Sequence, residues 1–446
     1  CYGNNKGKNM KFYNRTSELA ELQRIQNLSF SDHSRLTVVT GRRRIGKTSL
    51  IMKSVEGLPT VYLFVGRKSE ATLCSEFIPI ISQSLDTFVP AEIRTFRSLF
   101  QYLMELASQK PFNLVIDEFQ EFYNINESVY SDMQNIWDEY KEKSKLNLIV
   151  CGSVYSLMKR IFENAREPLF QRANHRIVLR PFNVEIIKNI LSDHYKEYSN
   201  DDLLAFYMIT GGVARYIELM IEARAFTKEA LLDMVFSENS YFLDEGRNGL
   251  IEEFGKDYTT YFSILSLLAS SKTSRPEIEG ELGMSVGPQI KNLETDFNLI
   301  KRVIPIFAKP QTRQIKYYID DNFLNFWFRF IYKYRSVIEI GNFDYLKDII
   351  RRDYTVYVGR VLEKYFREKL ILSKRYSAIG SYWENGNQNE IDIVALNEME
   401  KQMFIGEVKY NRKSLNMRVL EEKAINIKAS HPKYHIEFVG LSLEDM

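Results

Sequence analysis

Over roughly the first 180 residues, short apolar runs alternate with segments whose apolar residues have the spacing of an amphipathic helix. The apolar runs predict buried strands at 36–40, 61–65, 113–116 and 146–151. Helical spacing of apolar positions predicts helices at 17–28, 49–55, 95–108 and 127–143, the last with Asn126 as its cap. Strands that alternate with helices predict a parallel sheet covered on both faces, so the expected fold class is α/β.

The pattern changes twice after residue 182. Helices dominate from 183 to about 247, and the strand signal disappears. Three helical segments at 258–270, 275–282 and 285–297 then precede a β-hairpin expected at 299–307 and 314–319, which is the order of a winged helix. The aromatic run at 323–330 predicts a helix that buries its rings in an interdomain core rather than stacking on bases. From about residue 354 the order is helix, strand, strand, helix, strand.

Composition narrows the class of protein. The 446 residues are 45% hydrophobic and 26% charged, which is typical of a globular protein of several domains. The net charge of +2 indicates no global polycation, so a nucleic-acid site would be a local patch. Three widely spaced cysteines indicate a reducing compartment. Since no apolar run is long enough to span a bilayer, we expect no membrane partner and a cytoplasmic location.

Residues 41–48 match the pattern G-x-x-x-x-G-K-[ST], between an apolar strand and a helix. Glycines at both ends let the backbone curl around phosphate, and the following helix adds its positive end. Lys47 would reach the β- and γ-phosphates of ATP, and the Thr48 hydroxyl would complete a magnesium shell. The candidate ATP-binding residues are Gly41, Arg42, Arg43, Arg44, Ile45, Gly46, Lys47, Thr48 and Ser49.

A second buried strand ends in two carboxylates, Asp117 and Glu118. The carboxyl edge of a parallel sheet would place them beside the phosphates. We expect Asp117 to hold Mg²⁺ through water and Glu118 to polarise the attacking water. Ser153 follows the next strand, where it would either sense the γ-phosphate or serve as a turn and cap residue; the sequence leaves both open.

Two further strands near the end of the chain carry charged residues at alternate positions. Glu390 and Asp392 share one face of the first strand, and Glu407 and Lys409 share one face of the second. A tight turn near residues 399–400 would bring Asp392 opposite Glu407. Such a pair makes an oxygen-rich Mg²⁺ site, beside which Lys409 would orient or activate a water molecule. A half-exposed hairpin shows the same alternation, so the pattern alone is weak.

Several segments occur in a specific order along nearly the whole chain: 10–19, 40–48, 168–172, 179–182 and 211–216. They resemble the archaeal-type ATPases of the STAND branch of AAA-like P-loop proteins. The resemblance implies that Arg15 lies near the nucleotide base and that Arg172 sits against phosphate or a neighbouring subunit of a homo-oligomer. A surface ion pair is the alternative for Arg172. Gln171 stands where the family usually has glycine, and Ala214 where it usually has proline.

The same resemblance implies that the strands around Asp392 and Glu407 form a PD-(D/E)XK nuclease-like core. Glu363 matches the position where these folds often contribute another acidic metal ligand. The expected recognition helix of the winged helix has only Lys291 against Glu294 and Asp296, so we favour a regulatory lid over a DNA-binding role. The wing has better candidates for phosphate contact: Lys301, Arg302, Lys309, Arg313 and Lys316.

These observations divide the chain into six parts. We expect a disordered or upstream tail (1–9) before a natural start at Met10, a P-loop ATPase domain (10–182), a helical lid (183–254), a winged helix (255–320), a helical linker (321–353) and a nuclease-like domain (354–446). The expected function is an ATPase whose nucleotide state controls the nuclease-like domain, acting on DNA. The alternative is an ATP-dependent switch with a catalytically inactive C-terminal binding module. A small-molecule kinase lacks a recognisable acceptor site.

Overall fold

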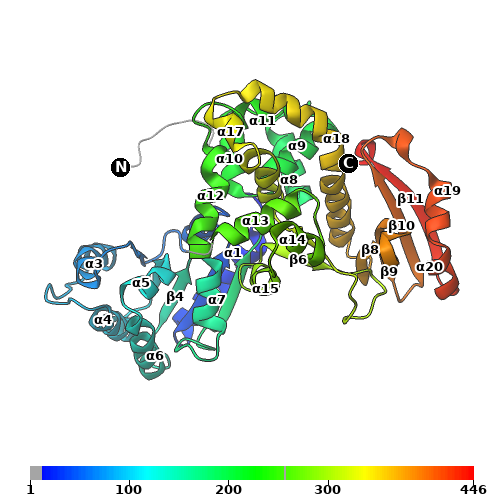
Figure 1. Cartoon of the computed structure of the whole chain (residues 1–446). Coiled ribbons are helices and arrows are strands. Elements are labelled where there is room, and N and C mark those ends of the chain that lie inside the picture. Colours follow the sequence, from blue (N-terminus) through cyan, green and yellow to red (C-terminus); the bar gives the residue numbers. More distant parts are fainter. Residues whose placement is uncertain (1–12, 256–257) are drawn as a thin grey trace. The chain divides into compact units, whose positions relative to one another are not determined.

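The computed structural model describes residues 13–255 and 258–446, which form two compact units (Figure 1). Unit 1 ends at Pro181, and unit 2 is Phe182–Met446. The expected tail at 1–9 lies outside the described residues.

A five-stranded sheet forms the centre of unit 1, with every pair parallel and the order β2-β3-β4-β1-β5. Its strands are β1 (Arg35–Gly41), β2 (Thr60–Phe64), β3 (Phe112–Asp117), β4 (Leu146–Cys151) and β5 (His175–Leu179). Every residue of β3 and β4 is buried, so helices cover both faces of the sheet. The predicted α/β class with a parallel sheet is confirmed. The sequence pattern did not single out β5, where buried and exposed residues alternate.

The helices of unit 1 are α1 (Thr16–Ser31), α2 (Lys47–Ser54), α3 (Glu70–Leu85), α4 (Phe96–Gln109), η1 (Phe119–Glu121), α5 (Phe122–Ile125), α6 (Ser128–Tyr140) and α7 (Tyr155–Glu163). Of these, α1, α2, α4 and α6 agree with the four predicted helices to within a few residues. Ser69 and Thr95 cap α3 and α4 through their hydroxyl oxygens. The sequence pattern did not predict η1, α5 or α7, nor α3, which contains Pro79, a residue that interrupts helical hydrogen bonding.

Unit 2 begins with a helical group, which a second group of three helices and a two-stranded antiparallel sheet follows. The first group is α8 (Val184–His194), α9 (Asn200–Thr210), α10 (Ala214–Glu222), α11 (Lys228–Val235) and α12 (Tyr241–Phe254). The second is α13 (Tyr258–Ala269), α14 (Arg275–Leu282), α15 (Gly287–Thr295), β6 (Ile300–Val303) and β7 (Lys316–Ile319). The element order is the expected one. The first strand is shorter than predicted because Pro305, which has no N–H to donate, follows it closely.

The aromatic run forms α16 (Asn322–Phe326) and η3 (Trp327–Tyr332), and its rings are buried as predicted. Trp327 donates its indole N–H to the carbonyl of Leu243 at 3.0 Å. Gly246 in α12 makes room for this indole, because a Cβ there would lie 2.3 Å from the ring. The run is thus a packing element between α9, α12 and α13.

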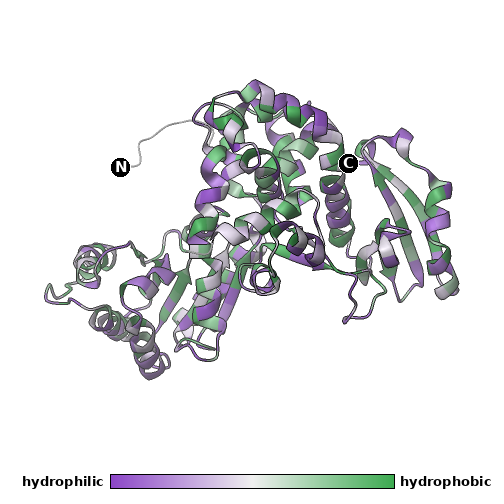
Figure 2. Ribbon diagram, in the orientation of Figure 1, coloured by the Kyte–Doolittle hydropathy of each residue, from purple (hydrophilic) through white to green (hydrophobic). Residues whose placement is uncertain are grey.

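The last part of unit 2 is a long helix followed by a four-stranded mixed sheet, order β11-β10-β9-β8. Figure 2 shows hydrophobic residues along these strands, whereas the helices carry both kinds. The elements are α17 (Arg335–Glu339), α18 (Phe343–Leu372), β8 (Ala378–Tyr382), η4 (Asn385–Asn387), β9 (Ile391–Asn397), β10 (Gln402–Lys409), η5 (Arg412–Ser414), α19 (Met417–Lys423), α20 (Ile425–Ser430), β11 (His435–Ser442) and η6 (Leu443–Asp445).

Two expectations for this region were wrong. Three strands precede α19, whereas the sequence pattern predicted two. The missed strand is β8, which has no buried residue and therefore lacks the alternation that indicates a strand. The boundary expected at residue 354 lies inside α18, which is continuous for 30 residues.

The loop between β6 and β7 packs against this C-terminal sheet. Ile306 donates its backbone N–H to the carbonyl of Ser381 in β8 at 2.9 Å, and Ile306 and Phe307 pack against the hydrophobic core of the sheet. The two parts of unit 2 are therefore packed together. Across residues 13–255 and 258–446, no helix has both the length and the apolar character needed to cross a membrane.

Candidate nucleotide-binding site and carboxylate cluster

The phosphate loop joins β1 to α2 through two glycines in conformations that other residues rarely adopt. Gly41 has φ 151° and Gly46 has φ 94°. A Cβ at Gly41 would lie 2.6 Å from the carbonyl oxygen of Leu179 in β5, so the close approach of these strands also requires glycine. Lys47, only 7% exposed, begins α2 and donates from Nζ to the carbonyls of Gly41 at 2.9 Å and Arg42 at 3.1 Å. The ammonium is thus held within the loop.

Asp117 at the end of β3 lies directly against the phosphate loop. Its Oδ2 accepts hydrogen bonds from the Thr48 hydroxyl at 2.8 Å and from the Tyr62 hydroxyl at 2.7 Å. Its Oδ1 accepts from the Cys151 thiol at 3.0 Å and from the backbone N–H of Glu118 at 2.9 Å. The structure therefore brings together Thr48 and Asp117, two predicted residues, with Tyr62 and Cys151, which the sequence analysis missed.

The chemistry of these groups fits a magnesium ion. A hydroxyl has one proton and two lone pairs, so Thr48 keeps its oxygen available as a ligand while it donates to Asp117. Carboxylate and hydroxyl oxygens are the donors that Mg²⁺ prefers.

Glu118 turns the chain after β3 with a left-handed backbone, φ 53°. Its Oε2 accepts from the Ser153 hydroxyl at 2.8 Å, from the Ser153 backbone N–H at 3.3 Å and from Gln120 Nε2 at 2.6 Å. Ser153 therefore binds the predicted catalytic carboxylate itself, an arrangement that neither of its two sequence-based roles included.

Arg15 and Arg172 occupy different environments. Arg15, 7% exposed, precedes α1 and donates from Nη2 to the carbonyl of Arg180 at 2.7 Å, next to the β5 residue that pairs with Gly41. Burial lowers the pKa of Arg15, and Glu18 at 3.2 Å opposes that shift. Arg172 instead forms an ion pair with Asp138 of α6 at 2.9 Å near the surface, which is the alternative that the sequence left open.

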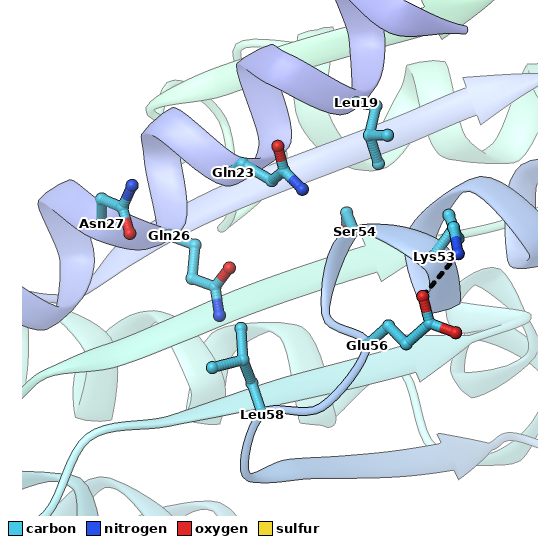
Figure 3. A pocket seen from close by; sticks show the side chains of 8 residues that line it. All are labelled: Leu19, Gln23, Gln26, Asn27, Lys53, Ser54, Glu56 and Leu58. Carbon is cyan, nitrogen blue, oxygen red and sulfur yellow. Dashed lines mark hydrogen bonds and ion pairs between the residues drawn. The ribbon is translucent and has the colours of Figure 1, made fainter.

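A pocket of about 360 Å³ lies elsewhere in unit 1, between α1 and the end of α2 (Figure 3). It is lined by Leu19, Gln23, Gln26, Asn27, Lys53, Ser54, Glu56 and Leu58. Lys53 and Glu56 pair with each other, and no phosphate-loop residue lines the pocket. This pocket is therefore separate from the phosphate loop.

The C-terminal sheet places Asp392 and Glu407 on neighbouring antiparallel strands, joined by a turn at 398–401 as predicted. Asp392 Oδ2 accepts the backbone N–H of Val408 at 2.8 Å. Lys409 Nζ lies 2.7 Å from Glu407 and 3.7 Å from Asp392. Lys423 of α19, which the sequence analysis missed, lies 3.2 Å from Glu407. Two ammonium groups thus neutralise a largely buried carboxylate pair.

Glu363 of α18 belongs to the same electrostatic environment. Burial, together with Asp392, raises the pKa of Glu363 to about 8. Burial and Glu407 raise the pKa of Asp392. Within the described parts of the chain, no group of three or more His, Cys, Asp or Glu side chains is arranged to hold a metal ion. Glu363 therefore stays a predicted ligand, without a three-carboxylate cluster to support it.

Glu390 and two of the wing lysines form ion pairs within unit 2. Glu390 pairs with Lys316 of β7 at 2.8 Å, and this lysine also lies over the Trp383 ring. Lys301 pairs with Asp320 at 2.6 Å. These two wing lysines are thus engaged within unit 2.

Comparisons with known proteins match two segments of the chain to protein families. Residues 12–220 match an ATPase domain predominantly from Archaea, and residues 327–425 match archaeal and bacterial proteins of unknown function. The uncharacterized protein MJECL04 of Methanocaldococcus jannaschii is 30% identical over 401 residues, which cover 87% of this chain and 86% of that protein. Among solved structures, the Walker-type ATPase paby2304 of Pyrococcus abyssi superposes with a TM-score of 0.57 at 15% identity. The match covers 73% of this chain and 99% of that one, and it shows a shared fold.

Proposed function

The chain belongs to the family of ATPases defined by an ATPase domain predominantly from Archaea, and from this membership we propose that Mg-ATP bound at its phosphate loop controls the C-terminal domain. The protein is an ATPase. The observation that carries the proposed site is the hydrogen bond from Thr48 to Asp117, which joins the phosphate loop to the acidic strand.

Each residue of the site has a defined part in the proposed reaction. The loop amides and Lys47 would bind the phosphate tail, and Thr48 and Asp117 would hold Mg²⁺. When bound, the ion would neutralise charge on the phosphate oxygens. Glu118 would polarise the attacking water, and Ser153 keeps the Glu118 carboxylate in place at 2.8 Å.

Lys47→Ala tests this site directly. The variant should lose ATP hydrolysis and bind a fluorescent ATP analogue far more weakly in the presence of Mg²⁺. Lys53→Ala is a matched control, because Lys53 lies on the same helix but is exposed and pairs with Glu56. Equal activity in both variants would contradict the assignment of the phosphate loop.

The segment from α13 to β7 is proposed to be a winged helix that acts as a regulatory lid. Lys301 pairs with Asp320, and Lys316 pairs with Glu390. These ion pairs support the lid interpretation over DNA binding by the wing, because paired ammonium groups are less available to phosphates. The packing of Ile306 and Phe307 on the C-terminal sheet supports it as well.

Control of the C-terminal domain would pass through the buried polar contacts of unit 2. The Tyr207 hydroxyl of α9 donates to Glu368 of α18 at 2.8 Å. Tyr354 of α18 donates to Asp201 at 3.0 Å, and Lys228 pairs with the same carboxylate at 2.6 Å. These contacts join α9, in the helical lid (183–254), to α18. We therefore propose that a displacement of the helical lid is transmitted to the sheet that α18 covers.

The C-terminal sheet is proposed to be a PD-(D/E)XK nuclease-like domain that acts on DNA. The opposition of Asp392 and Glu407, with Lys409 within 2.7 Å of Glu407, supports this proposal. The donor set suits Mg²⁺ chemically, with Asp392 and Glu407 as its ligands. Binding of the ion would compete with the ammonium groups of Lys409 and Lys423, so we assign no geometry to it.

Cleavage assays separate this proposal from an inactive binding module. Purified protein would be incubated with single- and double-stranded DNA and Mg²⁺ or Mn²⁺, without nucleotide, with ADP and with an ATP analogue. Cleavage should require Mg²⁺ or Mn²⁺ and should disappear when Glu407→Ala and Lys409→Ala are combined. Absence of cleavage in every state would favour the ATP-dependent switch.

A further inference from the structure

The carboxylate of Asp117 is surrounded by four hydrogen-bond donors, two of which belong to neither the phosphate loop nor the acidic strand. Tyr62 lies on the edge strand β2 and donates to Oδ2 at 2.7 Å. Cys151, the last residue of β4, is fully buried and donates to Oδ1 at 3.0 Å. The two side chains therefore hold opposite oxygens of the carboxylate from the strands on either side of β3.

The register of the parallel sheet explains why these donors meet. Tyr62 is paired with Val115 of β3, two residues before Asp117, and Cys151 ends the strand on the other flank of β3. Residues at the carboxyl ends of adjacent parallel strands reach the same edge. The carboxylate is thus fixed by groups that are far away in sequence.

A phenol and a thiol carry their protons at neutral pH by their ordinary pKa values. A protonated phenol and a protonated thiol can only donate toward a carboxylate, so their contacts with Asp117 are attractive.

We propose that Tyr62 and Cys151 are positioning residues for magnesium: they orient the Asp117 carboxylate and thereby set the affinity of the nucleotide site for Mg²⁺. The inference rests on the proposed Mg-ATP function of this site. Groups that hydrogen-bond a metal-binding side chain commonly change metal affinity when they are removed, although they do not touch the metal. The phenol is the stronger donor, because a thiol is a weak one.

The test measures magnesium dependence separately from folding and from nucleotide binding. A fluorescent ATP analogue is titrated into the full-length protein in EDTA and at increasing Mg²⁺, which gives the Mg²⁺ concentration for half-maximal enhancement of nucleotide affinity. Tyr62→Phe should raise this concentration about tenfold, a typical effect of removing such a donor, and leave the affinity in EDTA unchanged. Cys151→Ala should raise it by a smaller factor, and Cys151→Ser, which keeps a donor, should resemble the native protein.

Tyr140→Phe is the matched control. Tyr140 also donates to a carboxylate, that of Glu105, at 3.2 Å. It lies at the end of α6, near the start of β1, whereas the phosphate loop follows the end of β1. This variant should show the native Mg²⁺ dependence. Unfolding midpoints of all variants identify any that lose the fold, and Cys151→Ser keeps the test decisive if Cys151→Ala does so.

The outcomes distinguish the inference from the function on which it rests. If native protein binds the ATP analogue but Tyr62→Phe and Cys151→Ala keep its Mg²⁺ dependence, the positioning role is wrong and the site stands. If native protein binds no nucleotide at any Mg²⁺ concentration, the proposed function itself is wrong.

Discussion

Ser153 and Glu118 are joined by two hydrogen bonds, from the Ser153 hydroxyl at 2.8 Å and from its backbone N–H at 3.3 Å, both to Glu118 Oε2. The residues follow β4 and β3, which are neighbours in the sheet. The carboxylate proposed to polarise water is therefore oriented by the adjacent strand, in the same way that Asp117 is held by Cys151.

Ser153→Ala should slow ATP hydrolysis without weakening ATP binding. The hydroxyl bond to a charged group is lost, while Gln120 and the backbone N–H still hold Glu118, so we expect the turnover number to fall about tenfold. The measurement is steady-state hydrolysis beside binding of an ATP analogue. Ser131→Ala in α6 is the control, because the Ser131 hydroxyl donates to the carbonyl of Ser128 in the same helix. Unchanged turnover would show that the Ser153 hydroxyl is dispensable for orienting Glu118.

Gln171 has φ 58°, which is the left-handed conformation that glycine favours. Gln171→Gly should therefore stabilise the protein. Relief of about 1–2 kcal/mol of left-handed strain exceeds the roughly 0.5–1 kcal/mol entropic cost of glycine. Denaturant midpoints measure the effect, and Gln171→Ala, which keeps the strain, should differ little from the native protein. A destabilised glycine variant would mean that the glutamine side chain makes a larger contribution than the backbone.

Arg172 pairs with Asp138 at 2.9 Å, and both side chains are about one-third exposed. Partly exposed ion pairs contribute about 0.2–1 kcal/mol, so Arg172→Ala and Asp138→Ala should each lower stability by that amount or less. We expect both variants to retain ATP hydrolysis within about twofold. A large loss of hydrolysis in Arg172→Ala alone, especially one that depends on protein concentration, would instead indicate the contact with phosphate or a neighbouring subunit.

The sequence predicted the parts of the molecule whose residues are contiguous in the chain, and the parts whose apolar residues form a clear pattern. The phosphate loop is contiguous, so its glycines and Lys47 could be identified from spacing alone. Strands β3 and β4 are uninterrupted buried runs, which single them out from the helices around them. Asp392 and Glu407 were expected to face each other because a short turn fixes the register of an antiparallel pair, and the register agrees.

Contacts set by the parallel register or by tertiary packing were not predictable in the same way. Tyr62 and Cys151 meet Asp117 only because β2, β3 and β4 are adjacent in the folded sheet, an order that the sequence does not state. Lys423 of α19 contacts Glu407 of β10, which lies 16 residues earlier in the chain, and this contact depends on how the helix packs on the sheet. Strand β8 has no buried residue, so it lacks the alternation that reveals a strand.

Glu363 lies on α18 within reach of groups from several elements. Burial and Asp392 of β9, with a smaller contribution from Glu390, raise its pKa, while Arg367 and Arg360 of its own helix oppose the shift. The pKa is about 8, against an ordinary value of 4.5. The folded protein therefore keeps the Glu363 proton to a much higher pH than the unfolded chain does.

This difference predicts how stability changes with pH. Between about pH 4.5 and 8 the unfolded state has released the proton and the folded state still binds it, so stability from this group is present below pH 4.5 and is lost as the pH rises through 8. The slope cannot exceed one proton, about 1.4 kcal/mol per pH unit. Glu363→Gln removes this contribution, so its unfolding midpoint should fall less between pH 5 and pH 8 than that of the native protein. Glu421→Gln, on the exposed face of α19, should retain the native slope. Parallel curves for the native protein and Glu363→Gln would show that Glu363 is ionised in the fold, where Arg367 and Arg360 of its own helix favour the charged form.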